Sequence, residues 1–153
     1  MSLQWVPKSN GEFVASGGVH AGVDSGNELY VARAYHDGAI VPGKLHVTHS
    51  SVYIPYNMAE VPVQSYEVLV APNGSLSWVD SEGGAVPGNA VEGGRTNDGE
   101  LLFIGRVVHN GTVTVGKVHP SHGVCYFPYG GEELNSNVYE VLVKNAFGRH
   151  LGL

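Results

Sequence analysis

Apolar residues in this chain come in short runs separated by glycine-containing gaps. Three runs follow one another at Leu29–Tyr35, Ala39–Val47 and Val52–Tyr56, and Asp37-Gly38 between the first two is typical of a tight turn. Alternation of apolar and polar positions is imperfect, and several runs are apolar on both faces, which is typical of strands buried between two layers. No segment shows the period of an amphipathic helix. We therefore predict an all-β fold.

These runs recur as an internal repeat. A shift of 73 residues places Leu29–Val70 on Leu102–Val143 without a gap, so that repeat one spans roughly Trp5–Pro72 and repeat two roughly Trp78–Lys144. Units of about seventy residues are marginal alone. We therefore expect two tandem copies, related by a pseudo-twofold axis and packed as one antiparallel β domain over residues 1–153. The identical pairs include Arg33/Arg106, His36/His109, Lys44/Lys117, His46/His119, His49/His122, Tyr53/Tyr126, Tyr56/Tyr129, Glu60/Glu133 and Glu67/Glu140.

Composition and charge narrow the function classes. Hydrophobic residues make up 42% of the 153 residues and charged residues 14%, which is typical of a globular chain. The net charge of −6 argues against a nucleic-acid partner, and no apolar run is long enough to span a membrane. The single cysteine, Cys125, lies in an apolar run and is interpreted as a buried small hydrophobe. The start of the chain shows no secretory pattern, so we expect a cytoplasmic location, with vesicle association or release without a signal peptide as alternatives.

Repeat one carries, in order, the motifs Gly22-Val23-Asp24, Leu29-Tyr30-Val31-Ala32-Arg33, Gly43-Lys44-Leu45-His46, Ile54-Pro55-Tyr56 and Tyr66-Glu67-Val68-Leu69, and most of them recur in repeat two. Together they resemble the motifs of a known family. Over Trp5–Lys144 the chain is similar to the DM-nine tandem-repeat proteins, whose repeat also occurs beside pore-forming modules in natterin-like proteins. The resemblance implies a carbohydrate-binding function, because members with an assigned activity are lectins that recognise mannose without calcium, and others are linked to immune or pathogen responses.

The same resemblance implies a set of sugar-binding residues. In the sugar-binding members, an Asp of the Gly-x-Asp loop and a Lys of the Gly-Lys turn hold the sugar hydroxyls. Repeat one carries both, whereas repeat two keeps the lysine but has the loop Gly94-Arg95-Thr96-Asn97-Asp98, in which either Thr96 or Asn97 aligns with the first aspartate. We therefore expect repeat one to be the stronger site. The candidate carbohydrate-binding residues are Asp24, Lys44, Lys117, Asn97 and Asp98.

A carboxylate and an ammonium group suit a vicinal diol. The carboxylate accepts hydrogen bonds from two hydroxyls while the ammonium group donates to the same oxygens, and neither needs a metal ion. The alternative is that Asp24 and Lys44 form only an exposed surface salt bridge.

A His-x-x-His spacing at His46/His49 and His119/His122 raises the question of a metal site. On a strand, positions i and i+3 point to opposite faces, so two such rings would share an ion only if a turn separated them. Acidic or cysteine partners at the usual spacing are missing. We expect no metal and no cofactor, and we expect these histidines to stabilise loops or to line the sugar site.

Arg33 with Glu67, and Arg106 with Glu140, recur inside apolar strands. A buried charge needs a partner, so we predict two internal Arg–Glu pairs. We also expect Arg33→Ala to destabilise the protein far more than a change at Lys44, which we take to be exposed.

No motif of a catalytic nucleophile or a phosphate loop occurs, and Glu132-Glu133 has the appearance of an exposed turn. We therefore predict a non-catalytic protein that binds mannose or mannose-containing glycans. Shallow sites gain from being presented in several copies, so we expect a homodimer. The alternative is a non-catalytic interaction or scaffold protein of immune response or vesicle traffic that binds no sugar.

Overall fold

The structure is a computed structural model that describes residues 2–145. These residues form an antiparallel all-β fold with one short 3-10 turn, η1 (Pro120–His122), which confirms the predicted fold class. Residues 1 and 146–153 of the predicted domain lie outside the described residues. The strands are β1 (Gln4–Ser9), β2 (His20–Asp24), β3 (Asn27–His36), β4 (Ala39–His46), β5 (Val52–Tyr56), β6 (Ala59–Val63), β7 (Ser65–Val70), β8 (Leu76–Glu82), β9 (Glu92–Arg95), β10 (Leu101–His109), β11 (Thr112–His119), β12 (Val124–Tyr129), β13 (Glu132–Ser136) and β14 (Val138–Lys144).

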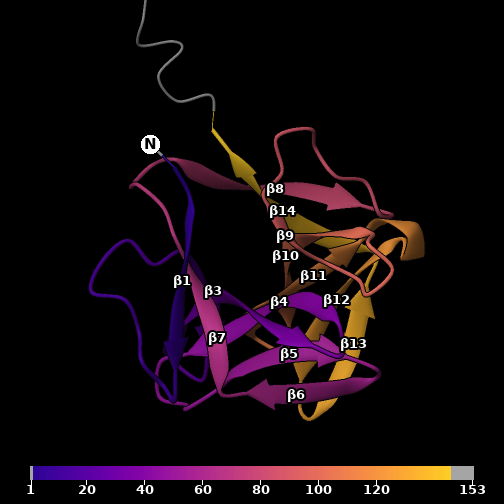
Figure 1. The fold of residues 1–153 in the computed structure, drawn as a ribbon. Coiled ribbons are helices and arrows are strands. Elements are labelled where there is room, and N and C mark those ends of the chain that lie inside the picture. Colours follow the sequence, from indigo (N-terminus) through magenta and orange to yellow (C-terminus); the bar gives the residue numbers. More distant parts are fainter. Residues whose placement is uncertain (1, 146–153) are drawn as a thin grey trace, which may run out of the picture.

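The two predicted repeats have the same internal topology. In repeat one, β3 pairs with β2, β4 and β7, and β1 and β7 pair at one end. In repeat two, β10 pairs in the same way with β9, β11 and β14, and β8 and β14 pair at the end. Figure 1 shows the copies as an indigo-to-magenta half and an orange-to-yellow half that lie against each other. No helix in residues 2–145 has the length and apolar character needed to cross a membrane.

Three pairings join the two repeats into one hydrogen-bonded sheet. Strand β2 of repeat one pairs with β11 of repeat two, and β9 of repeat two pairs with β4 of repeat one. The third contact joins β6 to β13, where Ala59 faces Glu132. Because β3 also pairs with β4, and β10 with β11, the sheet closes on itself. Each repeat therefore supplies strands to the other.

Glycine makes the first two crossings sterically feasible. A Cβ placed on Gly22 would lie 1.9 Å from the carbonyl oxygen of Val113, and a Cβ on Gly94 would lie 2.0 Å from that of Ile40. Ile40 and Val113 are the same position in the two repeats. Both crossings thus depend on the absence of a side chain at one equivalent residue.

The buried side chains form three clusters. One belongs to repeat one and includes Val41, Ile54 and Val68, and one belongs to repeat two and includes Phe127 and Val141. The third combines residues of both copies: Ala21, Val31, Leu69, Val91, Ile104, Val115 and Leu142. The two repeats therefore share apolar packing as well as hydrogen bonds. Cys125 is fully buried in the repeat-two cluster, as predicted, and burial raises the pKa of its thiol.

We predict that Gly22→Ala and Gly94→Ala each destabilise the protein by at least about 3 kcal/mol, the upper range for overpacking, because the new methyl group overlaps a backbone carbonyl that cannot rotate away. Chemical denaturation of the purified variants measures this loss. Gly88→Ala is the matched control, because a Cβ there meets nothing within 4 Å. Equal stability of Gly22→Ala and Gly88→Ala would contradict the observed crossing.

Candidate functional site

Two related pockets open near the ends of β4 and β11. Pocket one has a volume of about 340 Å³, and pocket two consists of adjoining cavities of about 360 and 460 Å³ that share Tyr56, Lys117, His119 and His122. Pocket one is lined by Asp24, Lys44, His46, His49, Tyr53, Glu60, Tyr129 and Gly130. Pocket two is lined by the four shared residues together with Asp37, Ala39, Val41, Asn57, Met58, Thr96, Asn97, Asp98, Glu100, Leu102, Tyr126 and Glu133. All five predicted sugar-binding residues therefore line one of these two pockets.

A buried lysine forms the floor of pocket one. Lys44 Nζ lies 3.1 Å from Glu60 Oε2, and it donates a hydrogen bond to the Pro128 carbonyl oxygen at 2.7 Å. The second Glu60 oxygen, Oε1, accepts a hydrogen bond from the Gly131 amide at 2.9 Å. The side chains of Lys44 and Glu60 are 6% and 14% exposed.

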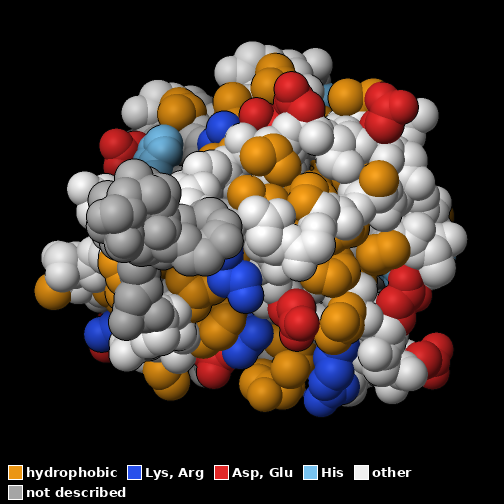
Figure 2. Space-filling view, turned by 90° about the horizontal axis from the view of Figure 1, so that it is seen from above, with side chains coloured by type: hydrophobic (Ala, Val, Ile, Leu, Met, Phe, Trp, Pro, Cys, Tyr) orange, Lys and Arg blue, Asp and Glu red, His pale blue; other side chains and the backbone are white. Residues whose placement is uncertain are grey.

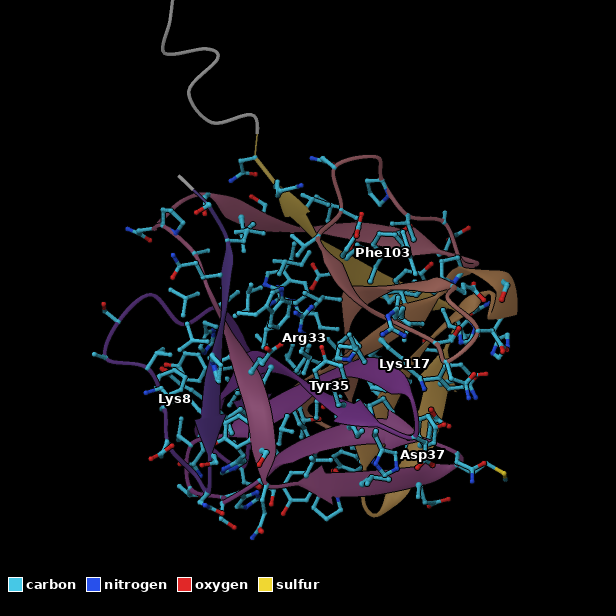
Figure 3. The ribbon with its side chains drawn as sticks, in the orientation of Figure 1. Lys8, Arg33, Tyr35, Asp37, Phe103 and Lys117 are labelled. Carbon is cyan, nitrogen blue, oxygen red and sulfur yellow. The ribbon has the colours of Figure 1, made fainter. Side chains whose placement is uncertain are left out.

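Pocket two repeats this floor. Lys117 Nζ lies 3.0 Å from Glu133 Oε2, and Glu133 Oε1 accepts a hydrogen bond from the Met58 amide at 2.9 Å. The two side chains are 10% and 9% exposed. In Figure 3, Lys117 and Asp37 lie on the same side of the molecule, where they line one cavity although they come from different repeats.

These contacts correct two predictions. Lys44 is not an exposed anchor, because β4 directs it inward against Glu60. Glu133 is not part of an exposed turn, since it lies on β13 and pairs with Lys117. The two glutamates were missed as site residues, although the identical pair Glu60/Glu133 in the repeat alignment was the signal that could have found them.

Each pocket has one tyrosine from each repeat. Tyr53 and Tyr129 line pocket one, whereas pocket two is lined by Tyr56 and by Tyr126, whose ring centroid lies 5.3 Å from Lys117 Nζ. Tyr129 of repeat two has its ring centroid 5.6 Å from Lys44 Nζ, and Tyr56 of repeat one has its centroid 5.4 Å from Lys117 Nζ. Both distances are within cation–π range. His109 packs edge-on against Tyr129, and His36 packs edge-on against Tyr56. The ring centroids are 4.8 Å apart in each pair. Neither pocket is therefore complete within a single repeat.

The His-x-x-His motifs form stacked pairs beside the lysines. The rings of His46 and His49 stack with their centroids 4.0 Å apart, and those of His119 and His122 stack with their centroids 3.6 Å apart. The rings meet because the strand ends at the first histidine and a turn follows, so the opposite-face rule for strands does not apply. Burial, and then the neighbouring ring, lowers the pKa of His46 and of His119. Within residues 2–145, no three His, Cys, Asp or Glu side chains are grouped as metal ligands.

The structure resolves the alignment of the two loops. Val23 pairs with Val113 and Arg95 pairs with Ile40, so Arg95 occupies the place of Val23, and Thr96 occupies that of Asp24. Asn97 and Asp98 lie in a turn that is one residue longer than the Ser25-Gly26 turn of repeat one.

A different carboxylate takes the place of Asp24 in pocket two. Glu100 Oε1 lies 3.0 Å from His119 Nε2, and the Ser121 amide and hydroxyl donate to the two carboxylate oxygens at 2.9 and 2.7 Å. The hydrogen bonds from Ser121 lower the pKa of Glu100. Sequence reasoning missed Glu100, because its position in the repeat is occupied by Asn27 in the first copy.

The predicted Arg–Glu pairs are confirmed. Arg33 Nε lies 2.8 Å from Glu67 Oε1, and Arg106 Nε lies 2.6 Å from Glu140 Oε1. They are only partly buried, with side-chain exposures between 19% and 34%. The guanidinium group of Arg33 lies over the ring of Trp5 at 4.0 Å. Lys44 is more buried than Arg33. The expectation that Arg33→Ala costs far more stability than a change at Lys44 assumed an exposed Lys44, and that assumption is wrong.

Known proteins share this duplicated pattern. A family model described as the DM9 repeat matches residues 1–63 and 24–136. The chain belongs to the DM9 repeat family. Natterin-4 of Thalassophryne nattereri is 31% identical over 147 residues, which cover 94% of this chain and 34% of natterin-4. Natterin-1 of the same fish is 28% identical over 98 residues, which cover 63% of this chain and 26% of natterin-1. This DM9 chain thus spans about a third of the length of natterin-4.

A solved structure shares the fold of this DM9 chain. The nematode sperm cell motility protein MFP2B superimposes with a TM-score of 0.70 at 14% identity. The match covers 97% of this chain and 48% of MFP2B. At this identity the likeness concerns the fold alone.

We predict that Lys44→Met destabilises the protein by about 3–5 kcal/mol, because it leaves the Glu60 carboxylate buried without a counter-charge. The double variant Lys44→Met/Glu60→Gln should recover much of that loss. Urea unfolding measures both, with Arg33→Ala run beside them. A Lys44→Met variant within about 0.5 kcal/mol of the wild type would show that the pair adds little to stability.

Proposed function

We propose that this protein is a non-catalytic lectin that binds mannose-type glycans, without calcium, in pockets one and two. The observation that carries the proposal is the duplicated pocket, in which a buried Lys–Glu pair lies below an aromatic ring and beside a carboxylate. Polar groups fixed in place beside an aromatic wall are typical of small-ligand sites.

The donors and acceptors of pocket one match a sugar diol. An ammonium group has three N–H donors. Lys44 donates one of these to the Pro128 carbonyl oxygen and points a second side of the ammonium group at Glu60 in an ion pair, so at least one N–H is available for a hydroxyl oxygen. Asp24 accepts a hydrogen bond from Ser25 Oγ at 3.2 Å and keeps further lone pairs for sugar hydroxyls. Tyr129 offers a ring face for the apolar side of the sugar.

The burial of Lys44 supports specific binding over the surface salt bridge considered above. Its ammonium group is already held by protein acceptors, so little side-chain entropy remains to be lost when a ligand binds. We further propose a role in immune or pathogen response and a cytoplasmic or vesicle-associated location. The family resemblance supports the role, and the chain composition supports the location.

We predict that mannose binds weakly and that a metal chelator leaves its affinity unchanged. We also predict that Asp24→Asn weakens mannose binding in pocket one about ten-fold, because a charge-assisted hydrogen bond is lost. Isothermal calorimetry and amide NMR shifts of Gly26 measure this. Asp80→Asn on β8 is the matched control, because Asp80 is exposed and lines neither pocket. If the protein bound none of the sugars on a glycan array, the scaffold alternative would be favoured instead.

We predict a homodimer at micromolar concentration, measured by light scattering. Strands β1 and β8 end the strand order and leave unpaired edges, which a second copy could cover. The face that carries β8 shows hydrophobic side chains between scattered charges of both signs (Figure 2). A monomeric mass with undiminished agglutination of mannose-coated particles would show that two pockets on one chain suffice.

A further inference from the structure

The floors of the two pockets are alike, but their rims differ in charge. In pocket one, Lys44 neutralises Glu60, and Asp24 is the carboxylate left without a cation among the lining residues. In pocket two, Lys117 neutralises Glu133. The lining carboxylates that then remain in pocket two are Asp37, Asp98 and Glu100.

Neighbouring basic groups do not cancel this excess. Glu100 lies 3.0 Å from His119, and burial lowers the pKa of this imidazole, which disfavours its charged form. The ring of His36 lies 3.8 Å from Asp37, which is itself 68% exposed. The Arg95 guanidinium donates to the Gly38 carbonyl oxygen at 3.3 Å and so places one positive charge near this rim. Three carboxylates less one guanidinium leave two negative charges in pocket two, against one in pocket one.

The carboxylates also come from separate segments around the floor. Asp37 lies in the turn after β3 of repeat one, whereas Asp98 and Glu100 come from the loop before β10 of repeat two. The two segments are close, since a Cβ on Gly38 would lie 3.5 Å from Asn97 Cβ. Glu100 is fixed by Ser121 and His119, so its position is set before a ligand arrives. A cationic group in the cavity would lie well within one Debye length of this rim.

We infer that pocket two selects a basic amino sugar, a hexose in which an ammonium group replaces one hydroxyl, more strongly than pocket one, whose only uncompensated lining carboxylate among the described residues is Asp24. The inference rests on the proposed function, because the shared floor, the aromatic wall and the hydroxyl contacts are those of the sugar site. The ammonium group adds an ion pair with the rim of pocket two, and the sugar ring keeps its contacts with Tyr56 and Lys117. The expected preference is about five-fold, the effect of one partly exposed ion pair.

The test is an NMR titration of the full chain with mannose and with mannosamine, which differ in one hydroxyl and one ammonium group. It is run at pH 6.5, about one unit below the usual pKa of an α-amine. The amides of Gly99 and Gly26 lie in the equivalent loops and report separately on pocket two and pocket one. We expect mannosamine to bind about five-fold more tightly than mannose at Gly99, with a smaller preference at Gly26, and we expect added salt to reduce both preferences.

The double variant Asp37→Asn/Asp98→Asn should abolish the preference at Gly99, measured as the ratio of the mannosamine and mannose affinities. The ratio is the readout because Asp98 is also a candidate sugar-binding residue, so its loss weakens both sugars alike. Both residues are exposed, and asparagine tolerates the left-handed backbone of Asp37, so the fold should survive. Asp24→Asn in pocket one is the matched control and should leave the preference at Gly99 unchanged. Equal affinities of the two sugars at Gly99, or the same preference at both loops, would overturn the inference and leave the proposed function standing. If neither sugar shifted either loop, the proposed function and the inference would fail together.

Discussion

The exchange of strands between the two repeats is the constraint on which the rest of the structure depends. Strand β2 reaches across to β11 and β9 to β4, and each contact passes through a glycine that has no room for a side chain. These crossings place the Asp24 loop beside the floor of pocket one and the Asn97 loop beside that of pocket two. Without them, each repeat would lose a wall of its pocket and part of the shared apolar cluster. The strand crossings therefore determine both the fold and the position of the two pockets.

The exchange also explains how two lysines can be buried. A buried ammonium group is costly unless it is paired and hydrogen-bonded. Lys44 meets this condition only with help from repeat two, which supplies the Pro128 carbonyl oxygen and, through the Gly131 amide, holds Glu60 in place. Glu133 in the other pocket is held in turn by the Met58 amide of repeat one. The ion pairs are thus part of the interface between the repeats, and they position a donor and an acceptor at the floor of each pocket.

The features that could be predicted from the sequence are those set by local spacing. The Arg33–Glu67 pair could be predicted because both residues lie in apolar runs and recur at the same separation in repeat two. The partner of Lys44 could be predicted only in part. The repeat alignment marks Glu60/Glu133 as an identical pair, but only the path of β4, β5 and β6 brings Glu60 to the lysine. The stacking of His119 and His122 could be predicted only in part, since Pro120 favours a turn after His119 but prolines also lie within β4, β5 and β12. The alignment of Asp24 with Thr96 required the register of the crossings, which no local pattern encodes.

Because each pocket uses both repeats, the two copies cannot diverge freely. A change in the Lys–Glu pair of one repeat alters the surroundings of residues from the other, and the two floors use the identical pairs Lys44/Lys117 and Glu60/Glu133. The rim is less constrained, since the side chains there reach solvent and support little packing. Differences between the copies therefore concentrate at the rim, where Asp24 is equivalent to Thr96 and Gly130 is equivalent to Asn57. A duplicated site of this kind keeps one mode of binding at its floor and can change its selectivity only where the pocket meets solvent.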